Sequence, residues 1–253
     1  MGLGDEIMAL GCAERLFEQT GRPVSILTMT ESPRDHDVWH GNPAWVHKGG
    51  KRYIDGGGSR PYIKGWRNKQ ALFNLDYRAR AGRVFLTAQD RALVADIKPP
   101  YAIVSPELKK GASPNKDWGK TNWEQVIKDF PCPVYQLCPD EKTKPIAGAI
   151  PYRTPTVRAA LAAIEKAAMV MAAEGGTHHM AASMRVPAVV VFGSFVPPTV
   201  TGYDFHYNIA VETDEGYCGR WQPCAHCQKA LASIKPETVR EKAILLWESY
   251  EEF

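Results

Sequence analysis

The residues from Glu174 to Ala182 have the types and spacing of an anion-binding turn. Positions 174–179 read Glu-Gly-Gly-Thr-His-His, and apolar runs flank them at 167–173 and 187–193. This pattern predicts a strand, a glycine turn, a short helix and a second strand. The N–H groups at the start of such a helix are unpaired and its dipole is positive there, which suits a diphosphate. An ordinary βα turn with a capping residue is the alternative, but the site chemistry favours a binding turn.

Composition places the chain among globular proteins. It has 253 residues, of which 44% are hydrophobic, enough to bury a core in one large or two small domains. No run of eighteen apolar residues occurs and no secretory signal pattern is visible, so we expect a cytoplasmic protein without a transmembrane segment. In that setting, six cysteines are more typical of thiols or metal ligands than of a disulfide framework.

Strand-like and helix-like segments alternate along the chain, which predicts an α/β fold. A helical stripe covers 6–19 and a buried strand follows at 24–27, whereas 30–62 is rich in loops. A proline pair at 99–100 reads as a linker, which divides the chain into an N-terminal domain, 1–98, and a C-terminal domain, 99–253. Further strands are expected at 83–86, 101–104, 133–137 and 189–192, and further helices at 121–130, at 156–166 and from Lys235 onward.

The first residues of the chain hold a second glycine-rich turn. Gly2-Leu3-Gly4-Asp5 precedes the helix of 6–19, where a doubly wound domain has its first βα turn, yet no strand comes before it. Either the sheet lacks that strand or another segment takes its place. From the residues alone, Asp5 is best interpreted as a helix N-cap, a position that favours aspartate.

Three segments together resemble the ADP-heptose:lipopolysaccharide heptosyltransferase family. Residues 2–9 resemble its N-terminal Gly-Asp turn, and residues 115–123, Asn-Lys-Asp-Trp-Gly-Lys-Thr-Asn-Trp, resemble its lysine–tryptophan loop. Residues 174–193 resemble its Asp-Thr-Gly-x-x-His-Leu-Ala-Ala signature and the following strand that ends in Phe-Gly. Glu174 stands where Asp is usual and Gly175 where Thr is usual. The chain is shorter than typical members, mostly in its N-terminal half, a compact layout similar to glycosyltransferases proposed for bacteriophages.

The resemblance implies a GT-B fold, in which two Rossmann-like domains face each other across a cleft. The N-terminal domain would be reduced, and the final helix would pack back toward it. The implied activity is an inverting, metal-independent glycosyl transfer from a nucleotide sugar, with no cofactor required. One carboxylate must then take the proton from the acceptor hydroxyl. The resemblance assigns that role to Asp5, ahead of the capping role.

Donor binding is expected at the glycine turn and in the matched lysine loop. Fixed donors and positive charges would stabilise the departing nucleoside diphosphate, and an acid at 174 would accept hydrogen bonds from the sugar. His178 is expected to be structural. Both lysines could instead belong to a solvated loop, and one of them could be idle. The predicted donor-binding residues are Gly4, Lys116, Lys120, Glu174, Gly175, Gly176, Thr177 and His179, with Ser105 and Ser113 as weaker phosphate candidates and a nucleobase pocket within 135–155.

Cys218, Cys224 and Cys227 cluster ahead of the last helix. A structural zinc site needs four ligands, and here the fourth would have to be His206 or His226. Because this set looks incomplete, packed free thiols are the preferred interpretation and a zinc ion is the alternative.

Basic residues are concentrated between positions 48 and 83. Ten lysines and arginines stand there against two aspartates, a net charge of +8 that leaves about −5 for the rest of a chain whose total is +3. This imbalance predicts a polyanionic partner, and the aromatic residues in the segment suit stacking on bases or sugars. An ordinary solvated surface is the alternative. The predicted acceptor-binding residues are Arg52, Arg60, Lys64, Trp66 and Arg67.

Two kinds of acceptor fit a polyanionic partner. One is DNA, with transfer to a hydroxymethyl-pyrimidine that is flipped out of the duplex, as in bacteriophage DNA modification. The other is the phosphorylated inner core of lipopolysaccharide, which sits on a membrane and calls for an apolar or amphipathic docking surface. The sequence offers no such helix, so DNA is narrowly favoured. A non-catalytic nucleotide-sugar binder on the same fold is a third possibility.

Overall fold

The computed structural model describes residues 2–54, 61–109 and 111–251 and has the expected α/β architecture. Its main sheet has six strands in the order β10-β9-β8-β5-β6-β7, and all neighbouring strands are parallel. In chain order this is the 3-2-1-4-5-6 arrangement of doubly wound sheets, which reverses direction between β5 and β8. The strands are β5 (Ala102–Ser105), β6 (Val134–Cys138), β7 (Ile150–Arg153), β8 (Met169–Ala173), β9 (Ala188–Gly193) and β10 (Tyr207–Ala210).

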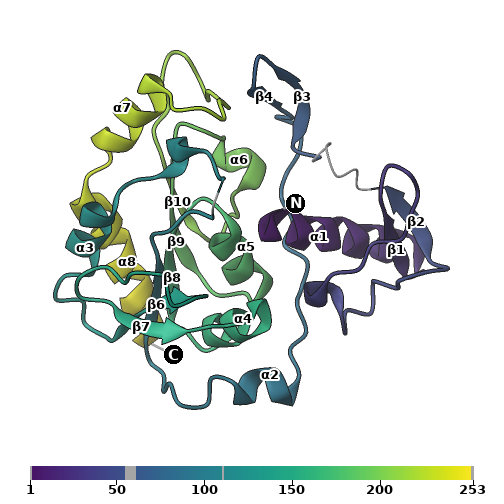
Figure 1. Cartoon of the computed structure of the whole chain (residues 1–253), viewed down its shortest axis with the longest axis horizontal. Coiled ribbons are helices and arrows are strands. Elements are labelled where there is room, and N and C mark those ends of the chain that lie inside the picture. The colour runs from purple at the N-terminus through teal and green to yellow at the C-terminus, as the bar shows by residue number, and fades with distance from the viewer. Residues whose placement is uncertain (1, 55–60, 110, 252–253) are drawn as a thin grey trace.

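Helices cover both faces of this sheet (Figure 1). On one face, α4 (Val157–Glu165) and α5 (Gly176–Ser183) pack in the same hydrophobic cluster as Val170 of β8. On the other face, α3 (Lys120–Ile127) and α8 (Pro236–Glu251) share a cluster with Met171. Successive residues of a strand point to opposite faces, so the strands of a sheet covered on both sides are apolar throughout. The final helix was expected to return toward the N-terminal segment; it instead packs on α3 and on strands β8 and β9.

The N-terminal segment holds α1 (Leu3–Thr20) and a separate two-stranded parallel sheet of β1 (Val24–Leu27) and β2 (Lys51–Ile54). Helix α1 packs against α5 on one side and β1 on the other. Within the described residues this sheet has two strands, and β1 also makes isolated bridges from Val24 to Trp45 and from Leu27 to Pro33. The reduced half consists of one long helix with two strands behind it.

Smaller elements complete the chain. The hairpin of β3 (Ile63–Arg67) and β4 (Gln70–Phe73) lies beside the loop before α7, because Ala71 N–H donates to the Gly219 carbonyl at 2.9 Å and Trp221 N–H to that of Lys69 at 3.1 Å. Nowhere in the described part of the chain does a helix combine the length and apolarity needed to cross a bilayer. The remaining elements are the 3-10 turns η1 (Asp37–Trp39) and η2 (Pro114–Lys116) and the helices α2 (Ala88–Ala92), α6 (Pro198–Thr201) and α7 (Ala225–Ser233).

The strand expected at 83–86 is a loop. Side chains, rather than a neighbouring strand, bind its backbone. Arg83 N–H donates to Glu14 Oε1 at 2.8 Å, and the Phe85 carbonyl accepts from Arg158 at 2.6 Å. An apolar run of this length does not identify the backbone partner, so the strand prediction was wrong, although Val84 and Leu86 are buried.

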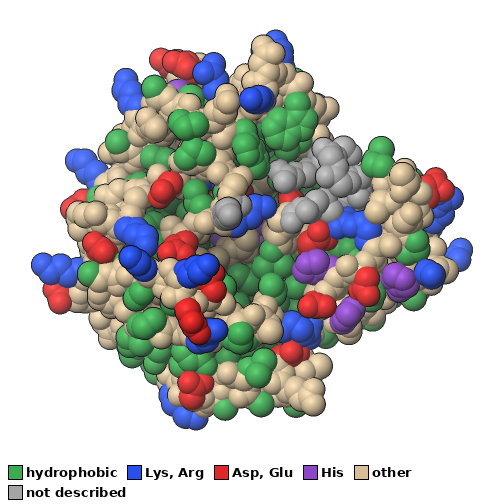
Figure 2. Space-filling view, in the orientation of Figure 1, with side chains coloured by type: hydrophobic (Ala, Val, Ile, Leu, Met, Phe, Trp, Pro, Cys, Tyr) green, Lys and Arg blue, Asp and Glu red, His purple; other side chains and the backbone are tan. Residues whose placement is uncertain are grey.

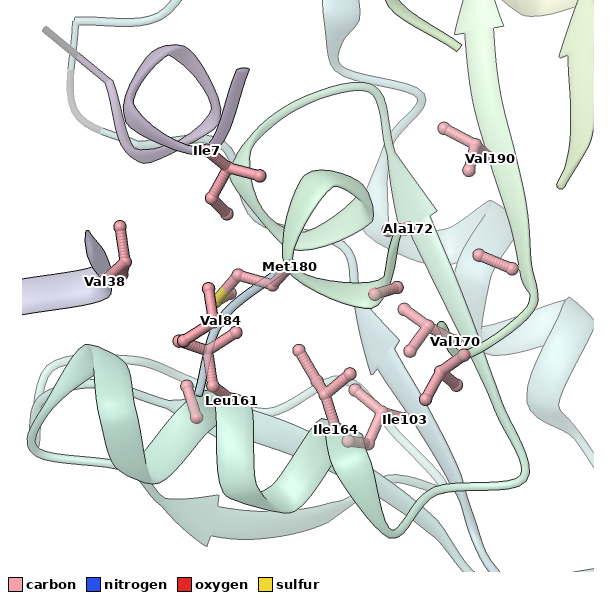
Figure 3. Close-up of a cluster of buried hydrophobic side chains, with 14 of the residues drawn as sticks. Ile7, Val38, Val84, Ile103, Leu161, Ile164, Val170, Ala172, Met180 and Val190 are labelled. Atoms are coloured by element: carbon pink, nitrogen blue, oxygen red, sulfur yellow. The ribbon is translucent and has the colours of Figure 1, made fainter. Parts of the chain in front are cut away.

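One hydrophobic cluster joins the N-terminal segment to the main sheet (Figure 3). Ile7 of α1, Val38 of η1 and Val84 face Met180 of α5 and Leu161 of α4 in this cluster. A polar link lies at its edge. Arg158 of α4 donates to both carboxylate oxygens of Asp90 at 2.8 and 3.0 Å and to the Asp37 carbonyl at 2.8 Å. These contacts hold the start of α1 in a fixed position relative to α5.

Candidate functional site

A cavity of about 440 Å³ opens where the strand order reverses, at the carboxyl ends of β5 and β8. Doubly wound sheets bind ligands at this point, because the loops on either side of it diverge. The hydroxyl groups of Ser105, at the end of β5, and Thr177, in the first turn of α5, form a hydrogen bond of 2.9 Å that joins these two ends. The start of α1 forms the opposite wall with Gly2, Gly4 and Asp5. Figure 2 shows this face of the molecule hollowed near its middle.

The glycine turn supplies two backbone donors rather than three. Gly175 N–H already donates to His178 Nδ1 at 3.0 Å, so this nitrogen is not available to a ligand. The other ring nitrogen of His178 lies 3.0 Å from the Thr201 carbonyl, and the side chain is fully buried. Both ring nitrogens of His178 thus have backbone partners. Within the described residues, no hydrogen bond occupies the N–H groups of Gly176 and Thr177, which begin α5 and line the cavity.

His179 lies on the cavity wall, with 3% of its surface exposed. Its Nδ1 is 2.6 Å from the hydroxyl of Tyr203. The opposite edge of the ring faces α1, and a Cβ on Gly4 would lie 2.2 Å from Cδ2 and 2.9 Å from Nε2. Glycine at position 4 thus permits α1 to approach the ring. Burial, assisted by His178 and Lys116, holds the pKa of His179 well below its usual value, so the ring is neutral at pH 7.

Lys116 and Glu174 form a buried ion pair on the same wall. Burial opposes the charged form of Glu174, but Lys116 and His178 outweigh it, and the pKa of Glu174 is lowered. The ammonium group of Lys116 also lies 4.9 Å from the centre of the Phe195 ring. Lys120 lies elsewhere: its side chain is exposed, bonds to Glu107 and to the Lys144 carbonyl, and does not line the cavity. Of the two lysines, the structure brings only Lys116 to the turn.

Asp5 lies at the cavity, facing the glycine turn from α1. It is the third residue after the N-cap Gly2, not the cap itself, and its Oδ2 accepts from Gly2 N–H at 2.8 Å. Its Oδ1 accepts from the hydroxyl of Tyr62 at 2.9 Å. Each carboxylate oxygen has two lone pairs, so capping leaves Asp5 able to accept a further proton or hydrogen bond.

The predicted acceptor residues that the structure describes belong to two different elements. Arg52 belongs to β2 and pairs with Glu31, whereas Lys64, Trp66 and Arg67 belong to the β3–β4 hairpin. Lys64 is 3.4 Å from Asp76. Trp66 is 47% exposed and packs edge-on against Trp221 at 6.1 Å. Arg60 lies outside the described residues.

Sequence reasoning missed Tyr62, Tyr203 and Trp221, although Tyr62 and Trp221 line the cavity and Tyr203 bonds to His179. Tyr62 stood among the aromatic residues of the basic segment, but its partner Asp5 is 57 positions away. No local pattern marks Tyr203 or Trp221. Ser113, a weaker phosphate candidate, is fully buried and bonds to the Arg220 carbonyl at 3.1 Å, so it supports the fold.

The cysteine cluster is more complete than its sequence spacing indicated. Ligand atoms of Cys218, Cys224, Cys227 and His226 all lie within 4.8 Å of one another. The sulfurs of Cys218 and Cys227 are 2.6 Å apart, and this contact lowers the pKa of Cys218 to about 6. His206, the other candidate ligand, packs on Tyr203 instead. None of the three cysteines lines the cavity described above.

No family model matches the chain, and no curated protein sequence matches it. Solved structures do. ADP-heptose lipopolysaccharide heptosyltransferase II of E. coli is 17% identical with a TM-score of 0.50, over 68% of this chain and 55% of that one. The iron-containing dodecameric glycosyltransferase TibC of enterotoxigenic E. coli is 17% identical with a TM-score of 0.53, over 70% and 52%.

A complex of TibC, titled a heptosyltransferase, with ADP-D-β-D-heptose is 16% identical with a TM-score of 0.56, over 79% of this chain and 60% of that one. The matches thus span little more than half of the length of those proteins. At such identities, the likeness concerns the fold. The strand order, the covered sheet and these neighbours together show that the chain has the GT-B glycosyltransferase fold, with a reduced N-terminal half.

Proposed function

We propose that this protein is an inverting glycosyltransferase that moves a sugar from a nucleoside diphosphate to a hydroxyl group of a polyanionic acceptor. One observation carries the proposal: Asp5 and the turn at 175–177 line the same cavity from opposite segments of the chain. A proton acceptor then faces a turn suited to bind a diphosphate, and the cavity between them has the volume of a small-molecule site. The neighbours that share the fold include a complex with a nucleotide sugar.

The donor diphosphate would lie at the start of α5. The two available N–H groups of Gly176 and Thr177 and the positive end of the helix dipole favour an anion there. His179 adds a ring donor, and Lys116 adds an ammonium group that its ion pair with Glu174 holds at the cavity wall. Since these groups are already fixed, they stabilise the charge that develops on the leaving diphosphate without reorganising.

Asp5 would act as the general base. It takes the proton of the acceptor hydroxyl while that oxygen attacks the anomeric carbon from the face opposite the diphosphate. The new C–O bond forms as the bond to the phosphate oxygen breaks, and the diphosphate leaves with the electron pair. Tyr62 donates to Oδ1 of Asp5 and thereby orients the carboxylate.

For the acceptor, we retain DNA carrying a hydroxymethyl-pyrimidine. The exposed Trp66 and the neighbouring Arg67 of the hairpin support it, because an aromatic face beside a guanidinium suits a stacked base. Binding to hydroxymethylated duplex should weaken steeply with salt, with a log–log slope of about −0.9 per phosphate contacted. A flat salt response, or transfer to lipopolysaccharide inner core alone, would remove the DNA assignment.

Asparagine at position 5 tests the base, because its amide oxygen can still accept from Gly2 N–H while the basic carboxylate is gone. Transfer by Asp5→Asn, assayed as diphosphate released from a panel of nucleotide sugars that begins with ADP-heptose, should fall at least ~100-fold. Donor affinity should stay near that of the wild type. Asp35→Asn, an exposed carboxylate paired with His40, is the matched control and should retain activity. Unchanged turnover in Asp5→Asn would exclude Asp5 as the base.

We further propose that Cys218, Cys224, Cys227 and His226 bind one iron or zinc ion, while the transfer step itself needs no metal. Three thiols and an imidazole are a tetrahedral N/S ligand set, and TibC, which shares the fold, is iron-containing. A tetrahedral ion with metal–sulfur bonds of about 2.3 Å separates its ligands by roughly 3.8 Å, so Cys218 and Cys227 would move apart on binding.

Such an ion would hold the loop that carries Trp221 against the β3–β4 hairpin. Metal analysis of the purified protein should find one ion per chain in the wild type and in Cys132→Ser, and a large loss in Cys227→Ser. Wild-type protein that purifies without a bound ion, or an unchanged metal content in Cys227→Ser, would contradict the metal site.

A further inference from the structure

We propose that Tyr203 is a positioning residue that fixes His179 as the tautomer with its proton on Nε2, directed into the cavity. This inference rests on the proposed function only for what the cavity binds. Its chemical content is that a neutral imidazole offers one N–H donor to an anionic group, such as a diphosphate. Tyr203 itself touches no ligand and acts through the ring of His179.

The hydrogen bond between the two side chains has only one consistent direction. The Tyr203 hydroxyl and His179 Nδ1 are 2.6 Å apart, and both residues are buried, with 6% and 3% of their surfaces exposed. Burial, with a contribution from Glu174, raises the pKa of Tyr203, so the phenol keeps its proton at neutral pH. Burial also keeps the imidazole neutral. One of two neutral groups must therefore donate to the other.

The phenol is the donor. Across the described residues, His179 provides the only hydrogen bond to the Tyr203 hydroxyl. If Nδ1 carried the proton and donated to the phenol oxygen, the phenolic proton would be buried without an acceptor, which costs about 1–3 kcal/mol. With the phenol donating to Nδ1, the phenolic proton has an acceptor, and the imidazole proton lies on Nε2, at the wall of the cavity.

The ring of His179 lines the cavity, and its Nε2 is not among the fully buried, unpartnered side-chain nitrogens of the described residues, so we infer that the Nε2 edge is reached from the cavity. A Cβ on Gly4 would lie 2.9 Å from Nε2, which places this edge at the wall formed by α1, and His179 and Gly4 both line the cavity. No hydrogen bond from another described residue occupies Nε2. The adjacent His178 differs, because both of its ring nitrogens lie within hydrogen-bonding distance of backbone groups, at 3.0 Å each. Two neighbouring histidines thus have separate roles, one structural and one facing a ligand.

The surroundings of Tyr203 keep its hydroxyl in place. Its carbonyl accepts from His206 N–H and from the Asn208 side chain, both at 3.0 Å. Its ring packs edge-on against His206 at 5.4 Å and against His179 at 5.6 Å. Just before it, a Cβ on Gly202 would lie 2.6 Å from the Pro198 carbonyl oxygen, so this tight approach requires glycine. Because this hydroxyl is held in place, its donated hydrogen bond can determine the tautomer of His179.

The direct test is nitrogen NMR of the ligand-free protein labelled at its seven histidines. Long-range proton–nitrogen correlation distinguishes the two tautomers, and His179→Gln identifies the signals of His179 by their loss. In the wild type, His179 should carry its proton on Nε2. In Tyr203→Phe, the Nδ1 bond is gone and the protonated-Nδ1 tautomer should become populated. A wild-type proton on Nδ1, or an unchanged Nε2 tautomer in Tyr203→Phe, would overturn the inference.

A binding readout shows what the tautomer does. ADP affinity of Tyr203→Phe should fall roughly 10-fold, the effect of weakening one buried hydrogen-bond donor. In a His179→Gln background, the same change should have little effect, since the glutamine amide presents its N–H without a tautomer to fix. Tyr152→Phe is the matched control: it also removes a bonded phenol, to Asp96 at 2.5 Å, but lies outside the cavity. An equal loss in both backgrounds would reduce Tyr203 to a packing role.

The two proposals fail separately. The NMR result requires neither a nucleotide nor a transfer reaction, so it judges the tautomer alone. If His179 has the expected tautomer but no nucleotide sugar releases diphosphate and ADP does not bind, the proposed function is wrong and the assignment of Tyr203 stands.

Discussion

Replacement of Gly4 by alanine tests how closely α1 approaches the donor turn. The new Cβ would lie 2.2 Å from Cδ2 of His179, and ordinary contact begins at 3.4 Å, so the ring or the helix must move by the difference, about 1.2 Å. The ring has little room for this movement. The centre of the His178 ring lies 3.9 Å from the centre of the His179 ring, and the Tyr203 hydroxyl lies 2.6 Å from its Nδ1.

The expected net effect of Gly4→Ala combines two opposed terms. Overpacking at a buried site costs about 1–3 kcal/mol, whereas alanine inside a helix gains up to about 1 kcal/mol over glycine. The free energy of unfolding should therefore fall by up to about 2 kcal/mol. Displacement of His179 by about 1 Å from the diphosphate should reduce transfer by up to ~100-fold.

Urea unfolding measures the change in stability, the diphosphate-release assay measures the loss of transfer, and calorimetric titration with ADP measures binding at the donor turn. Gly65→Ala is the stability control, because no atom lies within 4 Å of its added Cβ, and it should change the unfolding free energy by less than about 0.5 kcal/mol. If Gly4→Ala were more stable than the wild type and bound ADP equally well, the close contact between α1 and His179 would be refuted.

Two further predictions concern stability. Burial, with a contribution from His178, lowers the pKa of His206 to about 3. Between pH 6.5 and pH 3, therefore, the unfolded chain binds a proton at this histidine and the folded chain does not. The free energy of unfolding then falls as the pH falls. From pH 7 to pH 5, His206 should lower the free energy of unfolding by about 2 kcal/mol. Unfolding curves of His206→Phe at both pH values should show a correspondingly smaller change. A pH dependence equal to that of the wild type would contradict the buried neutral ring. Arg158→Ala leaves Asp90 buried without a charged partner, although Thr87 still donates to it, and should lower the unfolding free energy by about 3 kcal/mol. Arg153→Ala, which breaks the exposed pair with Glu141, should lower the free energy of unfolding by less than about 1 kcal/mol. Equal losses of stability for both variants in thermal unfolding would show that the Arg158–Asp90 pair stabilises the fold no more than an exposed pair.

The sequence predicted features that depend on neighbouring residues. The strands at 102–105 and 188–193 and the helices at 157–165 and 236–251 matched to within a few positions. Apolar periodicity decides these elements before any long-range contact forms. The glycine turn was recognised for the same reason, since paired glycines ahead of a helix determine its backbone and its unpaired N–H groups.

Only the tertiary structure decided which side chains meet. Tyr62 reaches Asp5, Tyr203 reaches His179 and Lys116 reaches Glu174 from distant parts of the chain. The 83–86 segment became a loop because distant side chains satisfied its backbone. The N–H of Gly175, which the sequence left open for a ligand, donates to His178 instead. A sequence states which groups can donate and accept, but their partners depend on distances set by the packing of α1 against α5, and that packing is a property of the whole fold.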